Sequence, residues 1–296
     1  MLIDRTPSWL VDWFATPGWN DVIDAWYARE LRRFDFPYET QLIDTEYGHT
    51  HLLASGRADA PPVVLLHGRS LNATLWRDYL RALADRYRVY ALDVVGEGGK
   101  SAAQHPFTWG DGYPRWLTQV LDALGVGQAH LIGMSFGGWL ALKMAIHAPE
   151  RVRALSLLAP AGFVWASAGF VWRGMRAGIT LRLEHARQLI EFCSGRHVVI
   201  RDEDCELLHT VFRYHRGNAE PPPPFTDAHL RGMMIPTQIL MGSHDRVFPP
   251  SMVIGRAQRT LPELHDSAIL RGIGHGMLSD RPEVVQQRVR AFLERH

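Results

Sequence analysis

The chain has 296 residues, of which 46% are hydrophobic and 21% charged, as in ordinary globular proteins and unlike disordered or fibrous ones. This length favours one large domain with a modest insertion over two equal domains. Lysine and arginine number 32 against 31 aspartate and glutamate residues, which gives a formal net charge of +1. Because nucleic-acid binding needs an excess of basic residues, we expect no nucleic-acid partner.

Only two cysteines are present, Cys193 and Cys205, and their spacing matches no redox or metal motif. We therefore expect a reducing, cytoplasmic location and no bound metal, and the state of the two thiols is left open. Asp4 and Asp12 interrupt the N-terminal stretch, so we expect no signal peptide. Residues 154–172 carry no charge, but a proline and two glycines break them. This favours a buried strand over a membrane span, and we expect no membrane partner.

Short apolar runs alternate with helical patterns along most of the chain, which is typical of a mostly parallel sheet covered by helices on both faces. Six runs are predicted to be parallel strands: 63–66, 89–94, 130–134, 155–158, 237–241 and 267–270. Before them, residues 41–45 and 50–54 flank a Tyr-Gly-His turn and predict an antiparallel hairpin at the sheet edge.

Three amphipathic helices are predicted around this sheet. One carries an apolar stripe over residues 75–83 and has Asn72 as its N-cap. The last helix begins at Asp280, which is its predicted N-cap, with Arg281 and Pro282 in its first turn. A helix near the N-terminus follows Asn20 and Asp21, and we expect its apolar stripe to pack on its own domain.

The strand pattern stops after residue 160 and returns after residue 228. The intervening sequence is first rich in Trp, Phe, Gly and Arg, then shows a helical pattern, and ends with a run of four prolines. We interpret residues 161–228 as a cap inserted into a core made of 1–160 and 229–296. Met134 and the aromatic residues Phe163, Trp165 and Phe170 are candidates for a substrate pocket, although cap aromatics can equally seal the cap against the core.

The strongest chemical signal is Gly133-Met134-Ser135-Phe136-Gly137, which has the form G-x-S-x-G. It follows a predicted strand and opens an apolar helix. Such a turn exposes a serine nucleophile at the carboxyl edge of a sheet, and glycines at the flanking positions let neighbouring backbone approach. Ser135 is therefore the predicted nucleophile.

A serine hydroxyl needs an adjacent base, and that base needs an acid to orient it. Asp245 follows a predicted strand by a few loop residues and is the predicted acid. His275 lies in a glycine-rich loop after the last strand and is the predicted base. The chain order serine, acid, histidine decides among fifteen histidines, since His265 and Asp266 lie before or beside the final strand.

The reaction also needs two N–H donors for the oxyanion. Phe136 supplies the first, and the second is expected from Arg69 in the His67-Gly68-Arg69 turn after the first parallel strand. The Arg69 guanidinium either meets an anionic substrate group or faces solvent at the mouth of the site. The glycine clusters 96–101 and 272–276 match neither a phosphate loop nor a dinucleotide fingerprint, so no cofactor is implied.

Together these segments resemble the α/β-hydrolase superfamily over the whole chain. Residues 60–68, 93–96 and 225–230 are similar to bacterial carboxylesterases of the naproxen-esterase kind. The resemblance implies an α/β-hydrolase fold, a cap and hydrolysis of carboxylic esters through an acyl-serine. One departure is the loop 93–101, which is one residue longer than the common form and lacks its arginine.

Several functions stay open at this point. The same triad serves thioesters, lactones or C–C bonds, and the fold also occurs in ligand-binding proteins with an idle site. The resemblance implies that an aspartate nucleophile is needed for dehalogenase or epoxide hydrolase chemistry, so Ser135 argues against both. The expected partner is a small-molecule substrate, and the oligomeric state, a homo-oligomer included, is left open.

Overall fold

An eight-stranded sheet forms the centre of the computed structural model, which describes residues 18–196, 198–215 and 220–296. The strands are β1 (Glu39–Thr45), β2 (Gly48–Ser55), β3 (Pro62–Leu66), β4 (Arg88–Leu92), β5 (Ala129–Met134), β6 (Val152–Leu158), β7 (Thr237–Gly242) and β8 (Leu264–Leu270). Their spatial order is β1-β2-β4-β3-β5-β6-β7-β8. β2 pairs antiparallel with β1 and β4, and the other neighbours pair parallel. The predicted α/β fold is confirmed.

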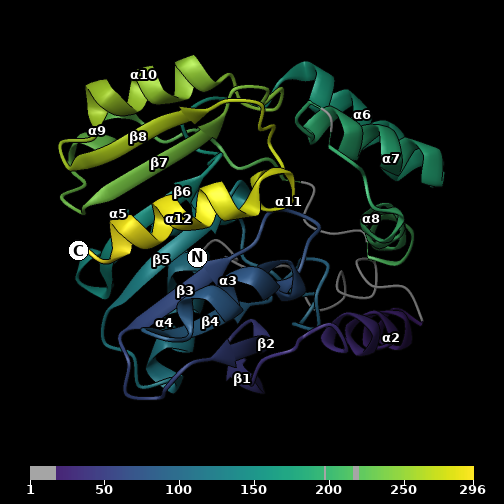
Figure 1. Cartoon of the computed structure of the whole chain (residues 1–296), viewed down its shortest axis with the longest axis horizontal. Helices are drawn as coiled ribbons and strands as arrows, with labels where there is room; N and C mark the ends of the chain where they lie inside the picture. The colour runs from purple at the N-terminus through teal and green to yellow at the C-terminus, as the bar shows by residue number, and fades with distance from the viewer. Residues whose placement is uncertain (1–17, 197, 216–219) are drawn as a thin grey trace.

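Helices surround the sheet, and α3 and α12 lie in front of it in Figure 1. They are α2 (Trp19–Leu31), α3 (Arg77–Leu83), α4 (Gly112–Ala123), α5 (Phe136–His147), α6 (Ala168–Thr180), α7 (Leu183–Cys193), α8 (Asp202–Tyr214), α9 (Asp227–Arg231), α10 (Pro250–Thr260), α11 (Met277–Asp280) and α12 (Pro282–Leu293). None of the helices described is long and apolar enough to cross a bilayer. The uncharged stretch 154–172 divides between β6, a loop and the start of α6.

Strand boundaries differ from the predicted ones where polar residues interrupt the apolar pattern. β6 begins three residues early because Arg153 faces solvent between buried neighbours. β8 likewise begins at Leu264, so His265 and Asp266 lie within the strand. This strand forms the sheet edge, where half-exposed positions accept polar side chains. β4 ends at Leu92, two residues early, because Asp93 begins a buried loop.

The first helices show how capping and burial set local structure. Asn72 caps as predicted, since its side chain accepts a hydrogen bond from the Thr74 N–H. The turn that it caps is a 3-10 helix, Ala73–Trp76, which leads into α3. α2 begins at Trp19, and its buried residues join the main core, so it packs on its own domain. Residues 1–17, which include Asp4 and Asp12 and were considered for a signal peptide, lie outside the described residues.

The segment between β6 and β7 contains α6, α7, α8 and α9. Figure 1 shows α6, α7 and α8 together at the right, on the side toward which β7 and β8 point. The proline run that follows has no regular structure, and the Pro223 carbonyl accepts a hydrogen bond from the Trp139 indole at 2.9 Å. The division into core and cap stays a prediction, and residues 197 and 216–219 of the cap lie outside the described chain.

Candidate active site

Ser135 occupies the tight turn between β5 and α5, with φ 53° and ψ −112°. A positive φ is strained for a residue that carries a side chain. Neighbouring backbone holds the turn: the Ser135 N–H donates to the Leu158 carbonyl at 2.9 Å. The Ser135 carbonyl accepts from the N–H groups of Trp139 and Ala161, both at 3.1 Å. The backbone of Ser135 is therefore held in place at the N-terminus of α5, with its side chain partly exposed.

The two glycines that flank Ser135 allow this turn to form. A Cβ on Gly137 would lie 2.0 Å from the carbonyl oxygen of Leu66, and one on Gly133 would lie 2.3 Å from that of Gly137. Backbone atoms cannot move aside as a side chain does. The glycines are therefore required by the close approach of β3, β5 and α5.

His275 and Asp245 meet Ser135 at this edge of the sheet. The Nε2 of His275 lies 2.9 Å from the Ser135 hydroxyl oxygen, and its Nδ1 lies 2.8 Å from Oδ2 of Asp245. The other Asp245 oxygen accepts from the N–H groups of Val247 and Phe248 at 2.8 and 2.9 Å. The carboxylate and the imidazole are buried, so the three side chains form a continuous, largely dehydrated relay.

The end of α7 holds the His275 loop from the cap side. The Cys193 carbonyl accepts from the N–H of His275 at 2.6 Å and from that of Gly276 at 3.1 Å. The Phe248 ring packs against the imidazole at 5.4 Å between centroids. Burial raises the pKa of the Cys193 thiol to about 12, and the nearby Asp245 adds to the shift, so this thiol stays protonated.

Asp280 has a different position from the predicted N-cap. α11 ends at Asp280 and α12 begins at Pro282, so the cap position belongs to Arg281. Oδ2 of Asp280 instead accepts from the N–H groups of Gly195 and Gly274 at 2.7 and 2.6 Å. Burial raises the pKa of this carboxyl, although the two donors oppose the shift. Asp280 thus joins the loop of His275 to the end of α7.

The two segments predicted to carry the oxyanion donors lie close to Ser135. The Phe136 N–H opens α5, so no carbonyl one turn earlier accepts from it within the helix. The turn that contains Arg69 is close, because a Cβ on Gly68 would lie 3.5 Å from that of Ser135. The Arg69 guanidinium stacks 4.3 Å from the centroid of the Phe136 ring. The residues that carry both donors are therefore in contact.

The Arg69 guanidinium contacts the protein in addition to the Phe136 ring, and whether it also meets a substrate anion stays a prediction. It lies 3.6 Å from a carboxylate oxygen of Glu97 and donates to the Glu220 carbonyl at 2.9 Å. Burial raises the pKa of Glu97, while the Arg69 charge opposes the shift. Arg69 thus ties the turn after β3 to the segment that returns from the cap.

The candidate pocket residues divide into buried and exposed ones. Phe163 is only 1% exposed and belongs to the core, as does Met134 behind Ser135. Trp165 is 61% exposed, and Phe170 is half-buried between the core and the smaller cluster on the cap helices. The burial of Phe163 agrees with a sealing role, whereas Trp165 has free surface for a ligand.

The sequence did not reveal the role of Asp93, a buried carboxylate that joins distant segments of the fold. It is fully buried and receives the Tyr27 hydroxyl at 2.5 Å, the His51 Nδ1 at 2.8 Å, and the N–H groups of Ala73 and Lys100 at 2.7 and 2.8 Å. Burial favours its neutral form, but the hydrogen bond and charge of His51, the charge of His67 and the Tyr27 hydroxyl hold the pKa of Asp93 below its usual range. The glycine cluster 96–101 therefore wraps around a carboxylate.

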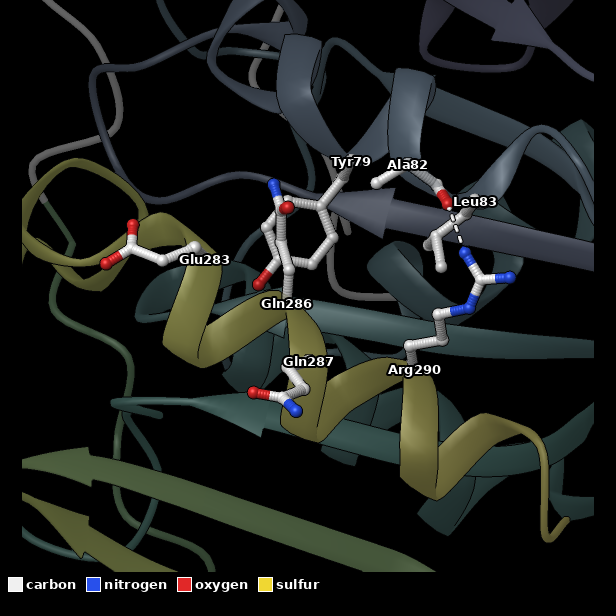
Figure 2. A pocket seen from close by; sticks show the side chains of 7 residues that line it. All are labelled: Tyr79, Ala82, Leu83, Glu283, Gln286, Gln287 and Arg290. Carbon is white, nitrogen blue, oxygen red and sulfur yellow. Dashed lines mark hydrogen bonds between the residues drawn. The ribbon is translucent and has the colours of Figure 1, made fainter.

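Two surface cavities lie away from the relay. One, of about 280 Å³, lies between α3 and α12, where Figure 2 shows Arg290 donating to the Ala82 carbonyl. The other, of about 410 Å³, lies between α6, α7 and the loop after β7. Within the described chain, no group of three or more His, Cys, Asp or Glu side chains is arranged to hold a metal ion.

Known proteins share this architecture. A family model of the α/β hydrolase fold matches residues 61–180. The chain is 29% identical over 281 residues to the uncharacterized carboxylesterase nap of Bacillus subtilis, covering 90% of either chain. It is 30% identical over 210 residues to 2-hydroxy-6-oxo-2,4-heptadienoate hydrolase of Pseudomonas putida, covering 64% of this chain and 73% of that relative.

A solved structure agrees with these matches. The crystal structure of naproxen esterase from Bacillus subtilis superposes with a TM-score of 0.81 at 27% identity, covering 93% of this chain and 98% of that one. The sheet order, the strained serine turn and the identities point the same way. The chain belongs to the α/β-hydrolase family.

Proposed function

We propose that this chain is a serine hydrolase that cleaves a carboxylic ester of a small, apolar or aromatic substrate through an acyl-serine intermediate. The observation that carries the proposal is the relay of hydrogen bonds from Ser135 through His275 to Asp245, at 2.9 and 2.8 Å. Distances of this size permit proton transfer between the hydroxyl and the imidazole. The carboxylesterases among the relatives support the choice of an ester bond.

In the proposed first half-reaction, the Ser135 oxygen attacks the ester carbonyl carbon while His275 takes the hydroxyl proton. The imidazolium then protonates the departing alcohol, and the acyl group stays on Ser135. In the second half, His275 takes a proton from a water molecule as the water oxygen attacks the acyl carbon. The imidazolium then returns this proton to the departing Ser135 oxygen, which releases the carboxylic acid and restores the hydroxyl. Asp245 orients the imidazole and stabilises its protonated form.

The backbone N–H groups of Phe136 and Arg69 are the proposed oxyanion donors. Each such donor is worth about 3 kcal/mol of transition-state stabilisation. The contact between the Arg69 guanidinium and the Phe136 ring supports this proposal, because it fixes the two backbone segments relative to each other. The ion pair with Glu97 restrains the guanidinium further.

A second candidate function is hydrolysis of a C–C bond on the same triad. The 30% identity to 2-hydroxy-6-oxo-2,4-heptadienoate hydrolase favours it specifically. Comparing kcat/KM for short aryl esters with that for a 2-hydroxy-6-oxo-dienoate decides between the two. A higher value for the dienoate would replace the ester by the C–C bond and leave the nucleophile assignment intact.

Substitution of Ser135 is the direct test of the proposal. We expect Ser135→Ala to reduce kcat for 4-nitrophenyl acetate by roughly 10⁴-fold or more, because no acyl-enzyme can form. A fluorophosphonate probe should add one label to the wild type, on Ser135, as read by peptide mass spectrometry. The Ser135→Ala protein should take up none.

Ser251 provides a matched control, because it is exposed at the start of α10 and is not part of the relay. Ser251→Ala should keep the activity and the label of the wild type. Hydrolysis by Ser135→Ala at the wild-type rate, with an unchanged circular dichroism spectrum, would overturn the proposal. An unlabelled wild type without esterase activity would point instead to an idle, ligand-binding site.

The proposed compartment is the cytoplasm, and the proposed partner is the small-molecule substrate. Cys193 and Cys205 are both unpaired, which suits a reducing environment. Burial raises the pKa of both thiols, so neither is an activated nucleophile.

A further inference from the structure

The cavity between α6, α7 and the loop after β7 has an unusual charge. Arg173, Arg176 and Arg246 line it, whereas Glu191 is the one acidic residue of its lining. Its volume of about 410 Å³ suits a small organic ligand. None of its lining residues belongs to the serine relay, so it is a separate feature of the surface.

Two of the arginines share one aromatic ring. The guanidinium carbons of Arg173 and Arg246 lie 4.3 and 5.4 Å from the centroid of the Phe192 ring. In the described part of the chain, no carboxylate lies within 4.0 Å of either guanidinium. Two like charges held at one ring repel each other unless an anion lies near them.

The third arginine has a donor without an acceptor. Arg176 hydrogen-bonds to the Gln188 side chain on α7, so its guanidinium is held between the two helices. Its Nε is nevertheless buried, and no acceptor for it exists among the residues described. A buried charged donor without a partner is costly, and a negative charge in the cavity would offset part of this cost.

Aromatic surface accompanies these charges. Trp172 lines the cavity and is 59% exposed, and Phe192 supplies a second ring. Guanidinium groups bind the two oxygens of a carboxylate or phosphate side by side, and aromatic rings bury an apolar body. We propose that this cavity binds a small organic anion, with its carboxylate or phosphate on the arginines and its apolar part against Trp172 and Phe192.

The site adjoins the relay through the backbone. Arg246 directly follows Asp245, and Phe192 directly precedes Cys193, whose carbonyl accepts from the His275 N–H. An anion that orders Arg246 and Phe192 therefore acts on the two segments that hold the acid and the base. Occupancy of the cavity should change kcat without competing with substrate.

Binding can be measured without turnover, which separates this inference from the proposed function. Benzoate, acetate and inorganic phosphate are titrated by calorimetry into the wild type and into Ser135→Ala. We expect benzoate to bind both proteins equally at one site, and acetate to bind at least fivefold more weakly because it lacks the ring. Arg173→Gln and Arg246→Gln should each weaken benzoate binding tenfold or more.

Arg182→Gln is the charge-matched control. Arg182 lies between α6 and α7, pairs with Glu184 at 3.2 Å and does not line the cavity. The Arg182→Gln protein should bind benzoate like the wild type, and circular dichroism should show that every variant is folded. Phosphate binding that exceeds benzoate binding and is lost in Arg246→Gln would assign the site to a phosphate ligand.

Three results would overturn the inference. The first is the absence of binding heat for both benzoate and phosphate at millimolar concentration. The second is benzoate binding that Arg246→Gln leaves unchanged, and the third is benzoate binding that competes with the ester substrate, since each of these places the anion elsewhere. If the wild type shows no esterase activity, this contradicts the proposed function and leaves the anion site untouched.

Discussion

Asp280 lies behind His275 and acts on it through the backbone. Its Oδ2 accepts from the N–H groups of Gly195 and Gly274, so one carboxylate holds the histidine loop against the end of α7. We expect Asp280→Ala to lower kcat by roughly tenfold to a hundredfold, because a small displacement of the imidazole disrupts its alignment with Ser135. Steady-state kinetics with a short aryl ester measure the effect, and KM should change much less.

A purely structural role for Asp280 is separated by the conservative variant Asp280→Asn. Asn keeps an oxygen that can accept from the N–H groups of Gly195 and Gly274, so its loss in kcat should be smaller than that of Asp280→Ala. A wild-type kcat in both variants would contradict a positioning role.

The sequence could predict some of these residues and not others. Ser135, Asp245 and His275 follow strands in a fixed chain order, and that order marks them without any knowledge of contacts. Asp280 and Asp93 act by accepting backbone N–H groups from distant segments. No sequence pattern reveals such a partner, and Asp280, two residues before Pro282, instead matches the pattern of a helix cap.

The connection between β5 and α5 depends on the absence of a side chain at Gly137. We expect Gly137→Ala to lower the free energy of unfolding by roughly 3 kcal/mol or more, because its Cβ would overlap the Leu66 carbonyl in the middle of the sheet. Urea titration measures the change. Esterase activity should fall in the same variant, since β3 carries the turn that contains Arg69.

Gly174 is the matched control, because it lies inside α6 and its Cβ would meet nothing within 4 Å. Gly174→Ala should raise the free energy of unfolding by up to about 1 kcal/mol, as alanine favours a helix. If Gly137→Ala and Gly174→Ala change the free energy of unfolding equally, the close backbone approach at Gly137 is not what requires glycine there.

Elements were predictable where apolar residues repeat without interruption, as in β3, β5 and β7. Their ends were less predictable at the sheet edge, because β8 is half-exposed and carries His265 and Asp266 within the strand. In the cap, the sequence signalled aromatic residues but not their burial. Phe163 is in the core and Trp165 on the surface, and this difference depends on packing between distant segments.

At the scale of the whole molecule, the segment between β6 and β7 meets the rest of the chain around the relay through several independent contacts. Cys193 on α7 holds the His275 loop, and the Glu220 carbonyl holds the Arg69 guanidinium beside the serine turn. The Trp139 indole holds the proline run after the cap. Hydrolysis should therefore be lost on any partial unfolding that detaches the segment between β6 and β7 from the rest of the chain.

Acid should destabilise the whole molecule through its buried histidines. Burial lowers the pKa of His130 and of His215 from the usual 6.5 to about 4. Between pH 6.5 and about pH 4, these two histidines bind protons in the unfolded chain but stay neutral in the folded one. The free energy of unfolding therefore falls as the pH decreases through this range. Each histidine contributes a slope of up to about 1.4 kcal/mol per pH unit.

Urea titrations between pH 7 and 4.5 measure this slope above the range in which Asp93 loses its charge. We expect the double variant His130→Gln/His215→Gln to have a clearly flatter dependence than the wild type, because glutamine takes up no proton in either state. The exposed His229 is the control, and His229→Gln should keep the wild-type slope. Equal slopes for the wild type and the double variant would mean that other groups cause the acid sensitivity, since the two buried imidazoles would then bind protons alike in both states.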